Sequence, residues 1–547
     1  MSKSMLARAS LTLATILWSL PAFAQTNPPA QILPVETRSV PPLPPSTIPP
    51  QGIPASSYGP SPEPSGPSER EHEWLQQFAV TDPSAPWPDQ IVPLTSNSAA
   101  PLASITTSFS GLDYPASLSY PPDTTVAKSG LRVLEATNSS LRLFNTSGSP
   151  LATTSTASMF GVSTGMTDPK VFFDNNSSYP RFILLVEDSP NVSTQSSNLY
   201  FSVSRTSNPS DFTSTNWCSY WLGGSQTLNG VNTFYDSPIF GVGADTLVYS
   251  TNQYSFTNGT FQGAIVNAGS KQQIENNATS CPWIGFYVFV PTPTDTTTFA
   301  LMPAQHYTNP SSFSGTTNPV YMISTHHPTV TEPSSSIYRV WRVRNVVSGA
   351  ATLDELDVTV SNGTYSTAPE APQLSGGNII DEGDPRVKQI AGIGDSLWLT
   401  LGTNCNVNGA NQGCIRVLDF GVGQDAGGHL TAYVAQSLLF SGAAGVYYWM
   451  PAIAATSNQS TIVAFLTSSS STYLSSAFTT KSVSAPSYSA ATAFFSGGCS
   501  NGNRDGDYQG AQTNPGDLAS FWVAGEATPP AGQCNSLWQT KIANVTP

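Results

Sequence analysis

Five aspartates stand just before runs of apolar and β-branched residues, where strand ends could present their carboxylates together. They are Asp123, Asp168, Asp236, Asp384 and Asp507, and a proline stands next to or close behind most of them. Several carboxylates at one place would bind a hard cation such as calcium through oxygen ligands, or supply the acid and base of a glycosidase. The alternative is purely structural, because an aspartate in a turn also caps the amides of its own chain.

The spacing of these aspartates predicts the elements that position them. From Asp123 to Asp168 is 45 residues, from Asp168 to Asp236 is 68, and Asp507 follows Asp384 by 123. Each interval holds several strand-like runs without helical periodicity, and proline is typical of a strand's first position. Recurrence on this scale indicates a β-propeller. We predict an all-β chain with a single propeller, with seven four-stranded blades favoured and six or eight as alternatives.

Seven repeating units can be drawn along the chain. They span about 121–160, 168–224, 235–275, 284–360, 384–440, 447–485 and 505–546. Placing the first and last units side by side would remove the open sheet edges of a linear array. Because inner strands start near the central channel, the five aspartates are expected to surround one channel mouth.

The N-terminal part differs in composition from the rest. Residues 1–24 combine Lys3 and Arg8, an apolar stretch and Ala22-Phe23-Ala24, which is typical of a secretory signal peptide. Residues 25–67 are predicted to be a disordered linker, because 14 prolines fall between residues 28 and 67. In 68–120 a capping box at Ser68–Glu71 predicts a short helix and a lead-in, and 121–547 is the predicted propeller domain.

Secretion to the periplasm or the extracellular space favours disulfides for the six cysteines, which contain no C-x-x-C zinc pair. Fifteen connectivities are open to six cysteines, and pairing of neighbours would close each loop within one blade or between adjacent blades. The candidates in chain order are Cys218, Cys281, Cys405, Cys414, Cys499 and Cys534.

Charge and hydropathy exclude some classes of partner. Only 10% of residues are charged and the formal net charge is −14, so a nucleic acid is not expected. No stretch after the leader is apolar for long enough to span a membrane. We expect a monomer whose partner is an extracellular carbohydrate or another surface polymer.

The last unit carries a more specific motif. Arg504 to Gly510 reads RDGDYQG, and Asn514 to Asp517, Phe521-Trp522, Glu526 and Trp538-Gln539-Thr540 follow it. This series resembles the closing blade of a family of secreted bacterial β-propellers that is distantly sialidase-like. Further likenesses are PPDT at 121–124, NSS at 138–140, and Asp384-x-Arg386 followed by SLW at 396–398. One departure is Gln509, which stands where that family commonly has serine.

The resemblance implies a propeller and suggests a second candidate site made of Arg504, Asp507, Tyr508 and Glu526. Arginine can hold a substrate carboxylate, and a tyrosine activated by a carboxylate acts as the nucleophile in sialidases. The Ser-x-Asp-x-Gly-x-x-Trp boxes of the sialidase superfamily are absent from the sequence. The alternative is a structural role for Arg504 and Asp507 in the closing blade.

Arginines, histidines and aromatic residues form three further sets, each with a functional and a structural interpretation. Arg386 could join Arg181, Arg205, Arg339 and Arg342 in a cluster, or each could pair with an acid on its own blade. His306, His326 and His327 suggest a metal site, but adjacent histidines on a strand point to opposite faces. Aromatic residues could stack on sugars or pack between blades, namely Trp217, Tyr220, Trp221, Trp283, Tyr447, Tyr448 and Trp449.

The sequence therefore predicts a secreted propeller that binds, or binds and hydrolyses, a glycan or surface polymer at one channel mouth. The proposed ligand-binding residues are Asp123, Asp168, Asp236, Asp384 and Arg386. Calcium is the cofactor to test. The alternative function is a non-catalytic adhesion or scaffold module of the cell envelope.

Overall fold

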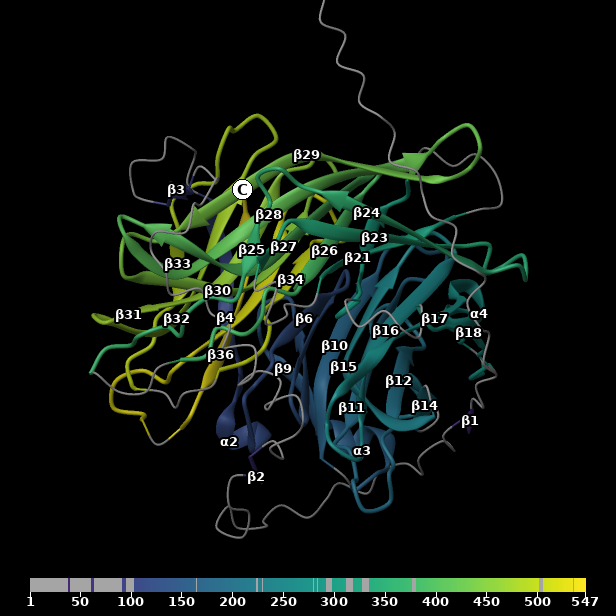
Figure 1. The fold of residues 1–547 in the computed structure, drawn as a ribbon. Coiled ribbons are helices and arrows are strands. Elements are labelled where there is room, and N and C mark those ends of the chain that lie inside the picture. The colour runs from purple at the N-terminus through teal and green to yellow at the C-terminus, as the bar shows by residue number, and fades with distance from the viewer. Residues whose placement is uncertain are drawn as a thin grey trace, which may run out of the picture.

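The computed structural model describes residues 38–39, 61–62, 91–94, 103–163, 165–222, 225–228, 230–278, 280–282, 284–291, 298–310, 318–326, 334–375, 380–500, 505–534 and 536–547. The signal peptide, the capping-box helix, Arg504, Trp283 and His327 lie outside these ranges. Regular structure in the described part is nearly all β (Figure 1). Its helices are α2 (Tyr114–Ser117), α3 (Thr156–Phe160) and α4 (Lys271–Glu275).

Most strands form antiparallel sheets of four strands that are consecutive along the chain. The first contains β6 (Thr125–Lys128), β7 (Arg132–Thr137), β8 (Ser140–Asn145) and β9 (Pro150–Ser155). The second contains β10 (Met166–Asp174), β11 (Arg181–Asp188), β12 (Leu199–Ser204) and β13 (Trp217–Trp221). The third contains β15 (Val231–Val242), β16 (Thr246–Ser255), β17 (Phe261–Ser270) and β18 (Phe286–Phe289), and β14 (Gln226–Leu228) pairs with β15.

The fourth sheet contains β19 (Met302–Pro303), β21 (Val320–Thr325), β23 (Ile337–Arg344) and β24 (Thr352–Thr359). The fifth set contains β26 (Gln389–Ile393), β27 (Ser396–Val407), β28 (Ala410–Gln424) and β29 (Leu430–Ser441). The sixth contains β30 (Val446–Ala455), β31 (Thr461–Ser469), β32 (Thr472–Lys481) and β33 (Thr492–Phe495). The last contains β34 (Gly510–Thr513), β35 (Phe521–Ala527), β36 (Gln539–Thr546) and β4 (Ser104–Asp113).

The first strands of six of these sets, together with the short strand β20, line a closed ring. Along it β6 contacts β10, β10 contacts β15, β15 contacts β20, β20 contacts β26, β26 contacts β30, β30 contacts β34, and β34 returns to β6. The short strand β20 (Gln305–Thr308) pairs in parallel with both β15 and β26, and so joins the third and fifth sets into one eleven-stranded sheet. The chain is therefore a β-propeller, as predicted. The predicted number of blades stays a prediction, since β20 merges two of the sheets.

The ring is closed by a strand from the N-terminal side of the propeller. Strand β4 pairs antiparallel with β36 along most of its length, so purple and yellow strands lie together in Figure 1. This segment was expected to be a lead-in, yet it supplies the outer strand of the last sheet. The pairing of β4 with β36 removes the free edge that β36 would otherwise present.

Short strands complete the fold. β1 (Arg38–Ser39) pairs with β13 and β2 (Ser61–Pro62) pairs with β5 (Ser119–Tyr120). Both β1 and β2 come from the segment expected to be a linker. β3 (Ile91–Pro93) extends the fifth set beside β29, and β22 (Ser334–Ser335) pairs with β25 (Tyr365–Ser366).

Three residue–proline pairs lie at β-bulges inside inner strands, namely Asp168-Pro169, Ser237-Pro238 and Met450-Pro451. The register shifts between Thr167 and Lys170 in β10, between Asp236 and Ile239 in β15, and between Trp449 and Ala452 in β30. The residue before each proline has a positive φ: 53° at Asp168, 51° at Ser237 and 43° at Met450. Proline is tolerated there because the bulge frees it from the ladder. The prediction that these prolines mark strand starts is therefore wrong for β10 and β15, which begin earlier.

One predicted unit boundary is also wrong. Residues 286–289 were assigned to the fourth unit, but β18 pairs with β17 and is the outer strand of the third sheet. The core lies between the sheets, where alternate side chains of neighbouring sheets interlock. Phe172, Ile183 and Tyr249, for example, share one buried cluster.

Candidate functional site

The bulges and turns bring carboxylates to one mouth of the channel. Asp123 precedes β6, Asp168 and Asp236 lie at the bulges of β10 and β15, and Asp384 and Asp507 precede β26 and β34. Ligand oxygens of Asp123, Asp168 and Asp507 lie within 4.8 Å of one another. A second group with the same spacing consists of Asp168, Glu187 and Asp236. Four of the five predicted aspartates therefore form one continuous acidic cluster, called here the acidic mouth.

A short polar network fixes the first group. Asp123 is fully buried, and its Oδ1 accepts the Asp507 amide at 2.6 Å. Its Oδ2 accepts the side-chain amide of Asn138 at 2.6 Å, and Asn138 Oδ1 accepts the Asp168 amide at 2.8 Å. Asn138 thus connects two aspartates from different sheets. In the sequence it was noted only as part of the resemblance.

A cation from the inner strand β10, Lys170, lies against this group. Burial lowers the pKa of Lys170 to about 7, while Asp168, Asp123 and Asp507 act in the opposite direction. Its ammonium lies over the ring of Tyr508. The Tyr508 hydroxyl donates to the Pro169 carbonyl at 3.0 Å, so this phenol is anchored to the backbone. The amine of Lys170 supplies positive charge where the three aspartates meet.

Glu187 on β11 is the site residue that the sequence analysis missed. It is 3% exposed, and one of its carboxylate oxygens lies within 4.8 Å of ligand oxygens of Asp168 and Asp236. Burial raises the pKa of Glu187 well above its usual range, and the charges of Asp168 and Asp236 raise it further. Carboxyls this close to one another share a proton readily, and the deeper burial of Glu187 favours its protonated form. The sequence signal was the pair of carboxylates, Glu187 and Asp188, that follows the apolar run 182–186.

Glu526 on β35 and Asp505 form the buried floor of the closing blade. Glu526 Oε1 accepts the Gly506 amide at 2.6 Å, and Asp505 Oδ2 accepts the indole NH of Trp449 at 2.6 Å. Burial raises the pKa of both carboxyls well above their usual range. A Cβ at Gly506 would lie 2.9 Å from both the Asp123 nitrogen and Glu526 Oε1, so only glycine fits there. Asp507 is thereby held beside Asp123 with Glu526 beneath.

Asp384 and Arg386 form a bidentate pair at the edge of the mouth. Arg386 Nε lies 2.7 Å from each Asp384 oxygen, and its guanidinium stacks over Phe299 at 4.7 Å. Asp384 and then Asp236 raise the pKa of Arg386 against the effect of burial. Asp384 therefore has a charge partner of its own. The other arginines do not join a cluster with it: Arg339 pairs with Asp357 and Arg342 with Asp354.

The donor set of the second group fits a hard cation. Three carboxylates offer oxygen, and Glu187 Oε2 is buried without a hydrogen-bond partner among the described residues. The proton shared by Asp168 and Glu187 would compete with a cation for the same oxygens. Calcium remains a prediction. The histidine metal site is not favoured by the described residues, since neither group contains a histidine.

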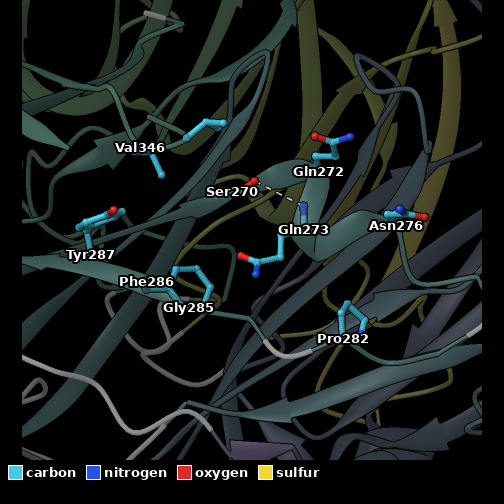
Figure 2. A pocket seen from close by; sticks show the side chains of 10 residues that line it. Ser270, Gln272, Gln273, Asn276, Pro282, Gly285, Phe286, Tyr287 and Val346 are labelled. Carbon is cyan, nitrogen blue, oxygen red and sulfur yellow. Dashed lines mark hydrogen bonds between the residues drawn. The ribbon is translucent and has the colours of Figure 1, made fainter. Parts of the chain in front are cut away.

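Below the mouth the channel is narrow. A cavity of about 40 Å³ is lined there by Lys170, Lys388, Gln389 and Tyr508 among others, and it is too small for a sugar ring. A sugar would therefore have to bind at the acidic mouth and not inside the channel. A much larger cavity, of about 730 Å³, lies at the end of β17 around Gln273, Phe286 and Tyr287 (Figure 2).

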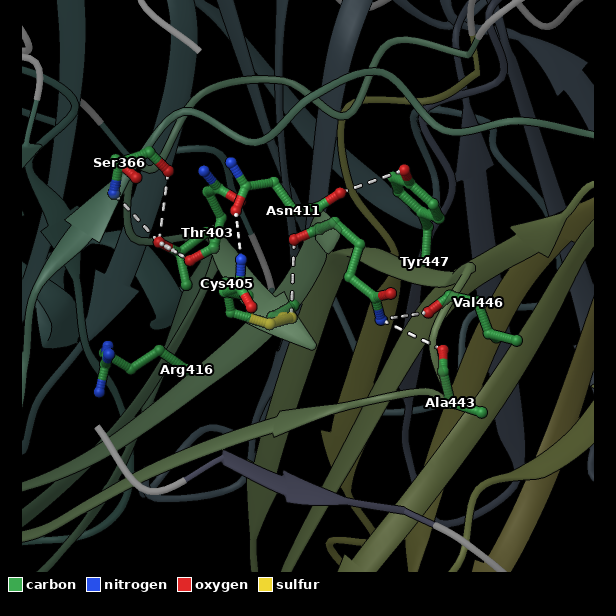
Figure 3. The surroundings of a disulfide bond; sticks show 12 residues. Ser366, Thr403, Cys405, Asn411, Arg416, Ala443, Val446 and Tyr447 are labelled. Atoms are coloured by element: carbon green, nitrogen blue, oxygen red, sulfur yellow. Dashed lines mark hydrogen bonds between the residues drawn. A yellow bond between two sulfur atoms is a disulfide. The ribbon is translucent and has the colours of Figure 1, made fainter. Parts of the chain in front are cut away.

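The cysteines pair as neighbours. Cys218–Cys281, Cys405–Cys414 and Cys499–Cys534 form disulfides with Cα separations of 5.4, 5.9 and 5.5 Å. The middle one crosslinks β27 and β28 (Figure 3). Nearby Gln412 Nε2 donates to the Val446 carbonyl at 2.9 Å, which ties this sheet to the next.

Most aromatic candidates pack inside the fold. Trp217, Tyr220, Tyr448 and Trp449 are buried, whereas Trp221 and Tyr447 are half-buried. In the described part of the chain no helix combines the length and the apolar character that crossing a membrane requires.

Comparison with known proteins yields structural likeness only. No family model matches the chain, and no curated protein matches it. A protein of unknown function from Dyadobacter fermentans is 10% identical, with 82% of this chain and 100% of that chain covered and a TM-score of 0.32. The α-L-arabinanase of Penicillium chrysogenum is 11% identical, with 80% and 98% covered and a TM-score of 0.32. The Trypanosoma rangeli sialidase is 8% identical, with 77% and 58% covered and a TM-score of 0.33. At such values the likeness carries no information on substrate.

Proposed function

We propose that this protein is an extracellular glycan-binding propeller that hydrolyses its ligand at the acidic mouth. The observation that carries the proposal is the close approach of the buried Glu187 to Asp168, which in turn lies beside a second carboxylate, Asp507. The raised pKa of Glu187 favours its protonated form. Glycoside hydrolysis needs one carboxyl that donates a proton and one ionised carboxylate on the same bond.

The roles follow from exposure and charge. Asp168 and Asp507 are half-buried, while Asp123 and Glu187 are shielded. Asp168, sharing the proton of Glu187, would protonate the glycosidic oxygen as the bond to the leaving sugar breaks. Asp507, which faces Lys170, would form the ester with the anomeric carbon, and water would then cleave this ester and return the proton to Asp168.

The spacing makes this assignment specific. Oxygens of Asp168 and Asp507 lie within 4.8 Å of one another, which is closer than the roughly 6.5–9.5 Å that inverting glycosidases need to place a water between their carboxyl groups. We therefore expect retention of anomeric configuration. Tyr508 and Glu526 are assigned structural roles in this mechanism. The Tyr508 hydroxyl donates a hydrogen bond to a backbone carbonyl, and Glu526 is buried beneath the mouth.

A second function, non-catalytic adhesion, is favoured by the capping role of some carboxylates. Asp123 accepts bonds from Asn138 and Asp507, and Asp384 is paired with Arg386. Carboxylates used in this way stabilise turns and do no chemistry. Under this function the mouth would bind a surface polymer without cleaving it.

Incubating the purified chain with a polysaccharide panel separates the two functions. Retention of a polysaccharide together with new reducing ends is the result expected for hydrolysis, and retention alone would support adhesion. If no polysaccharide is retained, the carbohydrate function is wrong. Disulfides persist in oxidising compartments, so we place this activity in the periplasm or outside the cell.

A further inference from the structure

The large cavity of Figure 2 lies on the opposite face of the propeller from the acidic mouth. Strand β17 runs parallel to β15, because both are antiparallel to β16. Asp236 lies in the first half of β15, whereas α4 follows the last residue of β17, Ser270, which pairs with Thr246. The two sites are thus at opposite ends of the third sheet.

Among the residues that the structure describes, the walls of this cavity are polar and carry no formal charge. The described lining residues include no aspartate, glutamate, lysine, arginine or histidine. The side chains of Gln272, Gln273 and Asn276 are exposed on one side, and Phe286 and Tyr287 of β18 are half-buried on the other (Figure 2). Val347, 55% exposed, extends the apolar side from the neighbouring sheet.

The wall formed by α4 is held rigidly. Ser270 caps the helix by accepting the Gln273 amide at 3.4 Å. The ammonium of Lys271 is 2% exposed and lies 2.8 Å from Asp174 Oδ2, and it also donates to the Gly243 carbonyl at 2.6 Å. The Cys218–Cys281 disulfide fixes the chain just beyond the helix. The amides of Gln272 and Gln273 are thus presented on a preorganised surface, which lowers the entropic cost of binding.

We propose that this cavity is a second binding site, for a neutral oligosaccharide. Aromatic faces beside side-chain amides suit the C–H faces and the hydroxyls of a sugar. A lining without charge offers no partner to a charged ligand, whose desolvation would go uncompensated. A volume of about 730 Å³ accommodates a short oligosaccharide, in contrast to the channel. The site does not depend on the chemistry of the acidic mouth.

The test is calorimetric titration with neutral tri- to hexasaccharides of pentoses and hexoses, with a sialylated trisaccharide as the charged comparison. Tyr287→Ala and Gln273→Ala are each expected to weaken binding of the neutral ligand roughly tenfold. Tyr433→Ala, which removes a tyrosine that is 67% exposed on β29, is the matched control and should bind as the wild type.

Asp507→Asn separates this inference from the proposed hydrolysis. It should leave calorimetric binding at the second site unchanged whether or not it abolishes turnover. Unchanged affinity in Tyr287→Ala with an unchanged melting temperature would overturn the proposal. So would binding of the charged trisaccharide alone, binding of an apolar peptide in its place, or no binding of any neutral oligosaccharide.

Discussion

Replacing Lys271 by methionine should destabilise the protein strongly and in a pH-dependent way. Lys271 and Asp174 are 2% and 0% exposed and lie 2.8 Å apart, and Glu275 is buried beside them. Methionine fills a similar volume but leaves the Asp174 carboxylate buried without its cation. Breaking one partner of a buried ion pair costs about 3–5 kcal/mol.

The expected shift in melting temperature follows from the size of the domain. About 420 residues in the described ranges, at roughly 2.1 cal/mol/K each, give an unfolding entropy near 0.9 kcal/mol/K. A loss of about 4 kcal/mol then lowers the melting temperature by about 4–5 °C at neutral pH. Burial raises the pKa of the neighbouring Glu275, and Lys271 acts in the opposite direction. Loss of Lys271 should therefore favour the protonated form of Glu275, so the deficit should shrink between about pH 7.5 and pH 4.5.

Differential scanning calorimetry at both pH values measures the loss in melting temperature of Lys271→Met, and Lys541→Met on β36 is the control. Lys541 is half-exposed, and its replacement should change the free energy of unfolding by no more than about 0.5 kcal/mol. A Lys271 variant as stable as the control, or one whose deficit grows as the pH falls, would refute the reasoning.

Three further predictions concern the mouth and the ring. Gly506→Ala should lower the free energy of unfolding by about 2 kcal/mol or more, measured by urea denaturation, because its Cβ meets Asp123 and Glu526; Gly516→Ala, where a Cβ meets only Asn514 at 3.6 Å, is the control and should be nearly neutral. The wild-type melting temperature should fall as the pH rises from about 5 to 8, because folding raises the pKa of several buried carboxyls and the folded state keeps protons that the unfolded chain loses; a rising melting temperature would contradict this. These carboxyls are Glu187, Glu275, Glu382, Asp505 and Glu526. Deletion of residues 1–113 removes β4 and exposes the edge of β36, so this variant should aggregate on size-exclusion chromatography. Deletion of residues 1–67 leaves β4 in place and should not cause aggregation.

The sequence predicted the architecture well because strand patterning and turn chemistry are local. The first predicted unit, 121–160, for example, contains all four strands of the first sheet, from β6 to β9. The closing strand β4 was missed because its partner lies more than 400 residues away along the chain, and no local pattern encodes such a pairing.

The candidate site was predictable in its aspartates but not in its partners. The repeated Asp-Pro signature located Asp168 because a bulge needs a residue that tolerates positive φ. Glu187 and Lys170 escaped attention because each lies inside an apolar strand, where only the packing of neighbouring sheets brings it to the mouth. Arg386 was expected to bind ligand, but bidentate pairing with Asp384 gives it a structural partner.

The most direct test of the proposed hydrolysis is the rate at which Asp507→Asn releases reducing ends from a polysaccharide that the wild type retains. The matched control is Asp425→Asn, which makes the same charge change in the hairpin between β28 and β29. The proposed mechanism predicts unchanged retention, an unchanged melting temperature and a rate on the order of a thousandfold lower than that of the control. A rate equal to that of the control would contradict the assignment of catalysis to the acidic mouth.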